Sequence, residues 1–155
     1  MEDKVKPIKR HKAIQGFSRE HHFGLLVSWK IRQGLKKGVD LKRIKRFTDW
    51  SFKIYIKPHF DGEEKFMFPL LDDDDKLKKR AIAEHRRLER LFKDKTDINR
   101  ALNLIEEELD AHIRFEERNL FNRIQEVANE EQLLKIEDFH KEIKEVEEWK
   151  DKFWE

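Results

Sequence analysis

A repeated pattern of histidine and glutamate constrains this chain more than any other feature. Twice along its 155 residues, a lone histidine that directly follows a glutamate precedes a His-x-x-x-Glu motif. The six residues of this pattern are His21, His59, Glu63, His85, His112 and Glu116. On an α-helix, residues i and i+4 project from one face one turn apart, so each motif is a two-point clamp for a metal ion. The pattern therefore predicts four helices that bring six side chains into one core.

Composition favours an all-α single domain that spans residues 1–155. Hydrophobic residues make up 37% of the chain and charged residues 44%, which is typical of helices with narrow apolar stripes and wide charged faces. The five glycines and three prolines are too few turn residues for a many-stranded sheet. A chain of this length can bury one continuous core.

Apolar residues recur at steps of three and four, which is the period of amphipathic helices. The stripes cover residues 17–35, 41–63, 77–92, 98–116 and 136–150. The connections between the first four stripes are short, so the expected fold is an up-down-up-down four-helix bundle. Its core comprises residues 17–127, and an additional C-terminal helix is expected at about residues 130–153.

Capping chemistry predicts where these helices begin and end. Ser18 is the candidate N-cap of the first helix and Asp40 that of the second. Thr96 or Asp97 is the candidate N-cap of the fourth helix. The first helix is expected to end near Gly38, because glycine is common just beyond a helix C-terminus.

Pro58 leaves two interpretations open for the second helix. Inside a helix, proline removes one backbone hydrogen bond and kinks the axis, here immediately before His59. Alternatively the helix ends at this point, with Asp61 and Gly62 in a turn. In that case His59 and Glu63 remain close together but lose the one-turn spacing.

All six residues of the pattern fall on stripe positions that face the core. Burying unpaired ionisable groups costs roughly several kcal/mol for each charged group. Metal cations would neutralise the carboxylates and accept the imidazole lone pairs. Imidazole combined with carboxylate suits iron, manganese or zinc, and two carboxylates make a two-metal centre feasible.

Four short motifs, taken in order, carry a family resemblance. They are Glu20-His21-His22, His59-Phe60-x-x-Glu63-Glu64 followed by Phe68-Pro69, Glu84-His85-x-x-Leu88, and His112-x-x-Phe115-Glu116-Glu117 followed by Leu120-Phe121. This ordered set resembles the hemerythrin-like, or HHE cation-binding, family over roughly residues 17–127. The resemblance implies a four-helix bundle with two non-haem iron (Fe) ions, bridged by carboxylates and by an oxo or hydroxo group. Manganese or zinc are the expected substitutes.

The resemblance also implies roles for the pattern residues. Glu63 and Glu116 would bridge the two ions, and the four histidines would complete the ligand set, namely His21, His59, His85 and His112. Oxygen-carrying members have a further histidine where this chain has Glu89, and an aspartate where it has Glu117. The chain therefore resembles the four-histidine, two-glutamate branch, which is associated with iron or oxygen sensing, nitric oxide chemistry and iron-centre repair.

His21 and His22 compete for one ligand position. His21 fits the apolar stripe and copies the Glu-His dipeptide of the third helix, whereas His22 has the same spacing to apolar residues as His85. We predict His21 as the ligand and keep His22 as the alternative. Glu64 and Glu117 lie about 100° around the helix from their neighbours. We expect them to be hydrogen-bond acceptors or surface charges rather than ligands.

The C-terminal segment carries Trp149, Phe153 and Trp154, which we expect to pack against the bundle. A homodimer through the C-terminal helix is the alternative, because free aromatic ends are unusual in solvent. The same segment contains one Glu-x-x-His motif, ending at His140. A ferritin-type site needs two such motifs, so His140 is placed outside the predicted site.

Charge and hydropathy exclude several partners. The formal net charge of +2 argues against nucleic acid, and no apolar run approaches transmembrane length, so no membrane partner is expected. With no cysteine there is no disulfide framework, and a cytoplasmic location is the default expectation.

The predicted function is a non-haem di-iron protein that binds, senses or reacts with oxygen, nitric oxide or peroxide. The alternatives are a di-iron enzyme of oxidative or nitrosative stress defence or iron-centre repair, or a metal-poor helical interaction module.

Overall fold

The computed structural model describes residues 9–141 and 148–155, and within them every regular element is helical. The α-helices are α1 (Gln15–Lys36), α2 (Leu41–Ser51), α3 (Lys57–Gly62), α4 (Lys76–Lys93), α5 (Ile98–Phe115), α6 (Phe121–Val127) and α7 (Glu130–Lys141). The π-helical turns are η1 (Phe52–Ile56), η2 (Glu63–Met67) and η4 (Glu116–Leu120), and η3 (Phe68–Leu70) is a 3-10 turn. The all-α prediction is therefore confirmed for the described residues.

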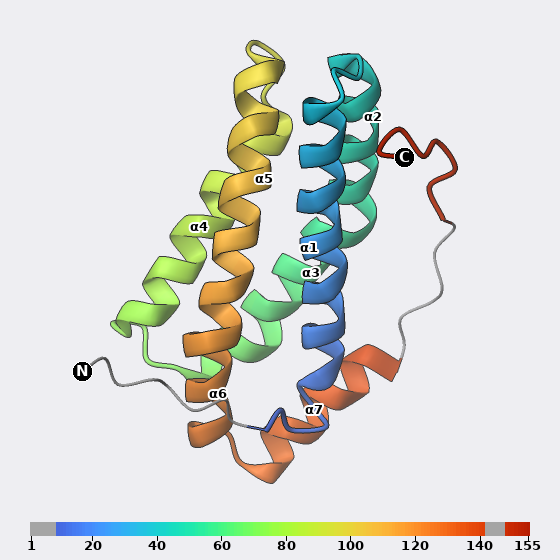
Figure 1. Ribbon diagram of the computed structural model, residues 1–155. Helices are drawn as coiled ribbons and strands as arrows, with labels where there is room; N and C mark the ends of the chain where they lie inside the picture. The colour runs from blue at the N-terminus through green and yellow to red at the C-terminus, as the bar shows by residue number, and fades with distance from the viewer. Residues whose placement is uncertain (1–8, 142–147) are drawn as a thin grey trace, which may run out of the picture.

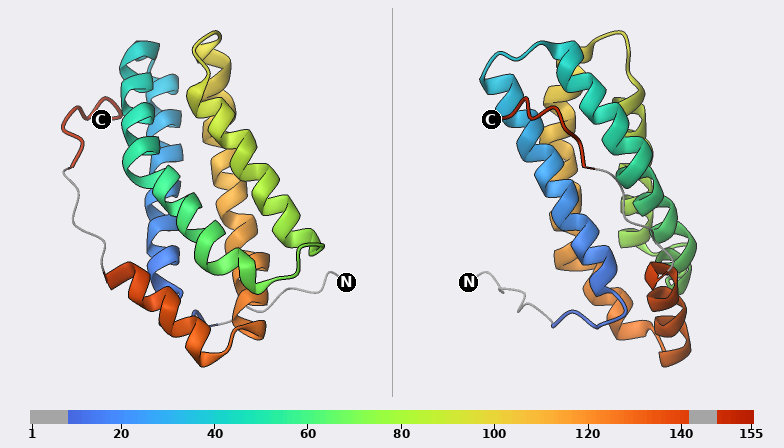
Figure 2. Two further views of the ribbon diagram at one scale, coloured as in Figure 1. Left: turned by 180° about the vertical axis from the view of Figure 1, so that it is seen from behind. Right: turned by 90° about the vertical axis from the view of Figure 1, so that its right-hand side faces the viewer.

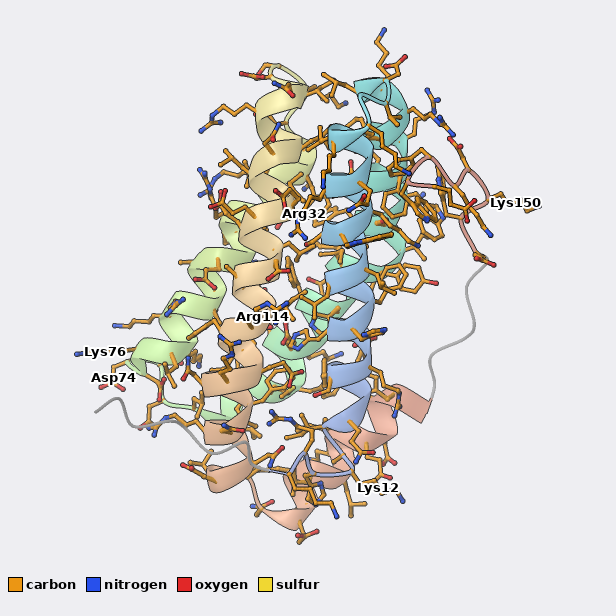
Figure 3. The ribbon with its side chains drawn as sticks, in the orientation of Figure 1. Lys12, Arg32, Asp74, Lys76, Arg114 and Lys150 are labelled. Atoms are coloured by element: carbon orange, nitrogen blue, oxygen red, sulfur yellow. The ribbon has the colours of Figure 1, made fainter. Side chains whose placement is uncertain are left out.

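Helix α1, the continuous run formed by α2, η1 and α3, helix α4 and helix α5 are the four helical runs of the fold. They lie alongside one another (Figure 1). Helix α5 packs against both α1 and α4, and α1 also packs against α2. Helices α6 and α7 lie at the end of the molecule where α1 begins (Figure 2). Charged side chains such as Asp74 and Lys76 extend outward from the ribbon (Figure 3). Among the helices that the structure describes, none is long and apolar enough to cross a membrane.

Most predicted helix ends are confirmed. The carboxylates of Asp40 and Asp97 each accept a backbone N–H from the first turn of their helix, α2 and α5 respectively. Gly38 follows α1 with a φ of 69°, a conformation that glycine adopts without strain. The prediction of Ser18 as N-cap is wrong, because α1 begins earlier and its N-cap is Ile14, which makes no side-chain cap. Burial of Ile14 in the core extends the helix beyond the expected start.

The C-terminal helix is shorter than predicted. Helix α7 is described over Glu130–Lys141, and residues 142–147 lie outside the described part of the structure. Residues 148–155 contain no regular helix, so the expected helix at about residues 130–153 is wrong over this last stretch. The final segment instead lies beside α1 and α2, away from α7 (Figure 2).

Tertiary contacts explain the path of this final segment. Phe153 is buried against the ring of Phe47, with centroids 5.3 Å apart, and against the backbone of Gly34. Arg43 Nε donates to the carboxylate of Asp151 at 2.8 Å. These contacts outweigh the helical pattern of the sequence, since each fixes the segment to a neighbouring helix. The prediction that the segment packs against the bundle is confirmed.

The core consists of two hydrophobic clusters with polar residues between them. Along α1, Phe17 belongs to one cluster and Val27 to the other. Along α4, Ala81 and Leu88 are divided in the same way. The histidines of these helices lie between the two clusters in sequence, so the fold places a polar layer inside an apolar core.

Candidate metal centre

The structure brings together all six side chains of the repeated pattern. Their candidate ligand atoms form two groups, and within each group all atoms lie within 4.8 Å of one another. One group is His21, His59, Glu63 and Glu116, and the other is Glu63, His85, His112 and Glu116. Both glutamates thus belong to both groups. The alternative residue His22 is exposed and belongs to neither group.

The inward-facing atoms of this cluster are buried, and most have no hydrogen-bond partner among the described residues. The atoms without a partner are Nε2 of His59, His85 and His112, both carboxylate oxygens of Glu63, and Oε2 of Glu116. His59 Nε2 and His85 Nε2 lie 3.2 and 3.1 Å from Glu63 Oε1, without hydrogen-bond alignment. Each unsatisfied buried group costs about 1–3 kcal/mol. Nitrogen and oxygen lone pairs that converge on one buried space fit metal cations.

Each cluster histidine uses its other ring nitrogen, Nδ1, to donate to a glutamate that neighbours a cluster residue in sequence. The pairs are His21 with Glu117 at 2.7 Å, His59 with Glu20 at 2.9 Å, His85 with Glu64 at 2.8 Å, and His112 with Glu84 at 2.7 Å. Such bonds fix the tautomer that leaves Nε2 free for a metal and raise the basicity of the ring. Glu64 and Glu117 are thus hydrogen-bond acceptors, which is one of the two roles expected for them.

Electrostatics in the metal-free chain favour charged forms throughout the cluster. Burial alone would lower the pKa of His21 and His85, but their hydrogen bonds to glutamates raise both pKa values well above the usual range. Burial alone would raise the pKa of Glu116, but its histidine neighbours lower it well below the usual range. The same competition places the pKa of Glu20 and Glu64 at about 2, so both are carboxylates that accept hydrogen bonds.

Each cluster glutamate is the first residue of a π-helical turn. Turn η2 begins at Glu63 and closes with the backbone N–H of Phe68 on the Glu63 carbonyl. Turn η4 begins at Glu116 and closes with the N–H of Phe121 in the same way. Single π-helical turns are rare in proteins overall, but they occur frequently at functional sites. Both copies of the repeated His/Glu pattern therefore have a π-helical turn that begins at the cluster glutamate.

The helical run continues through Pro58, so the alternative of a helix end at this residue is wrong. In a regular α-helix the proline ring would crowd the carbonyl of Ile54, four residues earlier. Ile54 lies in η1, whose wider turn accommodates the proline. His59 and Glu63 therefore keep the one-turn spacing that the sequence predicted.

Aromatic rings hold two of the cluster histidines in place. The ring of His85 stacks on Phe60, with centroids 3.9 Å apart, and also faces Phe68 at 5.3 Å. The ring of His21 stacks on Phe121 at 4.7 Å. These contacts orient the imidazoles and exclude water from the cluster.

A narrow pocket reaches the half of the cluster formed by His21 and His59. Its volume is about 10 Å³, close to the space that one water molecule needs. Its lining is mostly apolar and comprises Glu20, His21, Phe23, Gly24, Tyr55, Ile56, His59, Phe60, Leu109 and Ile113. Tyr55, the only tyrosine of the chain, packs on Phe23 with ring centroids 3.8 Å apart. The pocket suits one small, weakly polar molecule.

Sequence reasoning assigned no role to Glu20 and Glu84, although a signal was present. A glutamate directly precedes the lone histidine in both halves, and metal-binding histidines commonly donate to carboxylates. His140 was placed outside the site, yet its Nε2 lies 3.1 Å from Glu20 Oε1. No sequence pattern indicates that contact, because it depends on where α7 packs.

Comparison with known protein families identifies the family that this chain resembles. The profile of the Hemerythrin HHE cation binding domain matches residues 11–96, which is more than half of the chain. The matched range contains four of the six cluster residues and ends before α5, which carries His112. No curated protein and no solved structure matches the chain.

Proposed function

Because the chain belongs to the hemerythrin HHE cation-binding family, we propose that its buried cluster holds two metal ions, with iron preferred and manganese or zinc as substitutes. The proposed ligands of one ion are His21, His59, Glu63 and Glu116, and those of the other are Glu63, His85, His112 and Glu116. The observation that carries this proposal is the sharing of both buried glutamates between two four-residue groups. Two ions joined by shared carboxylates match that arrangement.

The donor count supports an open centre. Each ion would receive about four protein donors, and octahedral iron then keeps about two positions for other ligands. Glu89 stands where oxygen-carrying family members have a further histidine, and it accepts a hydrogen bond from Lys93 at 2.8 Å. It belongs to neither candidate ligand group. This arrangement favours reaction with an exogenous molecule over storage of the metal alone.

The proposed ligand is oxygen, nitric oxide or peroxide, which the protein binds, senses or converts. Bound iron supplies the one-electron redox chemistry that these molecules require. The pocket beside His21 and His59 supports entry at that half of the cluster, because its volume and apolar lining suit a small molecule. Glu20 and Glu117 hold the two rings with their Nε2 atoms directed inward.

We also propose that the four helical runs form the up-down-up-down bundle of the family. The short connections after α1 and α4 support this arrangement, as does the packing of α5 against both α1 and α4. In such a bundle the six cluster residues come from all four runs, as the two-metal proposal requires.

Metal stoichiometry tests the proposed function. Protein purified without affinity metals and loaded with Fe²⁺ under argon should contain about two irons per chain, with magnetic coupling between the ferric ions after oxidation. The exposed residue His22 offers a control, since His22→Ala should load equally well. One iron per chain, or uncoupled irons, would contradict a shared two-iron centre. Folded protein that binds no iron would favour the metal-poor helical module.

An enzyme that uses the same centre is the second candidate. The open metal positions and the pocket beside His59 favour it, because a substrate could reach the metal. Turnover of peroxide or nitric oxide by iron-loaded protein, compared with His59→Ala, distinguishes catalysis from binding. Stoichiometric reaction without turnover favours the sensing or binding function.

A further inference from the structure

Each glutamate that accepts a hydrogen bond from a cluster histidine is itself held by a second nitrogen donor farther out. These outer donors are Arg10 on Glu117 at 3.1 Å, Arg86 on Glu64 at 3.0 Å, Arg80 on Glu84 at 2.9 Å and His140 on Glu20 at 3.1 Å. Every cluster histidine is therefore the inner end of a chain that runs from imidazole to carboxylate to outer donor.

The two halves of the cluster obtain their outer donors from different parts of the fold. The half with His85 and His112 uses two arginines of α4, Arg80 and Arg86. The half with His21 and His59 uses Arg10, from the segment before α1, and His140, from α7. Among residues 9–141 and 148–155, elements outside the four helical runs thus complete the hydrogen bonding around one half of the cluster only.

The repeated sequence makes His140 and Arg80 direct counterparts. Glu20 precedes His21 as Glu84 precedes His85, and each of these glutamates accepts from the histidine of a neighbouring helix. Arg80 holds Glu84 from within α4, whereas Glu20 is held from α7 by His140. Arg80 donates to Glu84 in one half of the cluster, and His140, from a separate helix, donates to Glu20 in the other half.

The position of His140 is closely fixed. Oε1 of Glu20 accepts from His59 Nδ1 at 2.9 Å and from His140 Nε2 at 3.1 Å, so one oxygen joins the two rings. The ring of His140 packs edge-on against Phe17, with centroids 4.3 Å apart. It also lies against Gly16 so closely that a Cβ there would be 2.5 Å from the ring.

We propose that His140 is a positioning residue for the metal-binding ring of His59, acting through Glu20, and that α7 is thereby part of the metal centre. This inference rests on the proposed function, since it concerns how one half of the cluster holds its ion. Without His140, the carboxylate of Glu20, which is 28% exposed, is free to turn toward solvent. His59 then loses the fixed acceptor that directs its Nε2 into the cluster. The half that contains His112 keeps its own support from Arg80.

Binding of Co²⁺ tests this inference. Metal-free wild type, His140→Leu, His140→Gln and Arg80→Leu are titrated with Co²⁺ alone, with visible absorbance as the measure of affinity. In His140→Leu we expect one of the two Co²⁺ ions to bind about tenfold more weakly, as for loss of support to a metal-binding histidine. His140→Gln retains an N–H donor and should recover most of that affinity. His22→Leu is the matched control on an exposed histidine and should match wild type.

Proton NMR of the Co²⁺-loaded proteins identifies which histidine is affected. Wild type should show four hyperfine-shifted ring N–H signals, one from each cluster histidine. His140→Leu should shift or broaden one of them, and Arg80→Leu should change a different one. These changes should occur even though both variants retain the metal at high Co²⁺ concentration.

Three outcomes overturn the inference. His140→Leu that binds both ions like wild type, with four unchanged signals, shows that His140 does not position His59. A variant that only lowers the melting temperature of metal-free protein shows a structural role alone. Equal weakening of both ions shows general damage to the fold. If wild type binds neither Co²⁺ nor Fe²⁺, the proposed function fails together with this inference, whereas the first three outcomes leave the proposed function standing.

Discussion

Glu63 and Glu116 occupy equivalent places in the two halves of the molecule. Each lies four residues after a cluster histidine, begins a π-helical turn and is completely buried. Each also belongs to both groups of candidate ligand atoms. Substitution of either glutamate should therefore weaken metal binding at both positions, whereas substitution of a histidine should weaken it at one.

This difference predicts distinct metal contents for two substitutions in one motif. Glu116→Ala should reduce iron from about two ions per chain to well below one, because both ions lose a ligand. His112→Ala should retain about one ion, since it removes a donor from one group only. Metal analysis after anaerobic loading measures both values, with His22→Ala as control. Equal iron contents in Glu116→Ala and His112→Ala would contradict sharing of the glutamate.

Stability of the metal-free protein should fall as the pH rises above neutrality. The folded-state pKa values of His21 and His85 are raised, so their contribution is fully present below about pH 6.5 and is lost as the pH rises through the raised values. The folded-state pKa values of Glu63 and Glu116 are lowered, so their contribution is present above about pH 4.5 and is lost only in acid. The histidines therefore determine how stability changes between neutral and alkaline pH.

Calorimetry of metal-free protein measures this dependence. The melting temperature should be highest between about pH 4.5 and pH 6.5 and lower near pH 9. Metal binding should strengthen over the same rise in pH, because its ligands must be deprotonated. A melting temperature of the metal-free protein that is constant or increases from pH 6 to pH 9 would show that the histidines do not stabilise the fold by protonation.

Gly34→Ala should release the C-terminal segment. An added Cβ would lie 2.8 Å from the ring of Phe153 and 2.9 Å from Ile44, both of which are buried. Such overpacking costs about 1–3 kcal/mol and should displace the ring of Phe153, which weakens the attachment of its segment. Red-shifted tryptophan fluorescence and faster proteolysis near Trp149 measure the release. Gly38→Ala is the control, because it strains a left-handed residue in open space without contacting this segment.

Reduced iron-loaded protein should oxidise in air to a stable diferric form rather than release oxygen intact. The reason is the open centre, in which Glu89 pairs with Lys93 where oxygen carriers have a further histidine. Stopped-flow absorbance after mixing with oxygen, followed by exchange into argon, tests this expectation. Full recovery of the colourless diferrous state would identify a reversible carrier instead.

The helices and the six-residue cluster were predictable because one signal specified both. Apolar residues at helical spacing indicate the buried face of each helix, and His21, His59 and the other four residues of the repeated pattern lie on those buried faces. Burial without a partner then required a cation. The choice of His21 over His22 followed from the same stripe, and the structure places only His21 in the cluster.

Features that depend on tertiary contacts were not predictable in the same way. The irregular course of residues 148–155 depends on the fit of Phe153 between Gly34 and Phe47, which no local pattern encodes. The contact of His140 with Glu20 depends on how α7 packs against Gly16. Turns η2 and η4 also lack a sequence signal, whereas η1 lies directly before Pro58, whose ring its wider turn accommodates.

Turns η2 and η4 each bring an aromatic ring against the cluster, and the helices that carry them must keep their register. The residue that closes each turn stacks on a cluster histidine of the other half, Phe68 on His85 and Phe121 on His21. Deleting one residue between His59 and Glu63, in the regular helix before η2, would rotate Glu63 and Phe68 by about 100° around the helix and remove both from the cluster. A connection such as residues 94–97 carries no such constraint. We therefore expect single-residue insertions and deletions to be tolerated least inside these helices, directly beside the cluster.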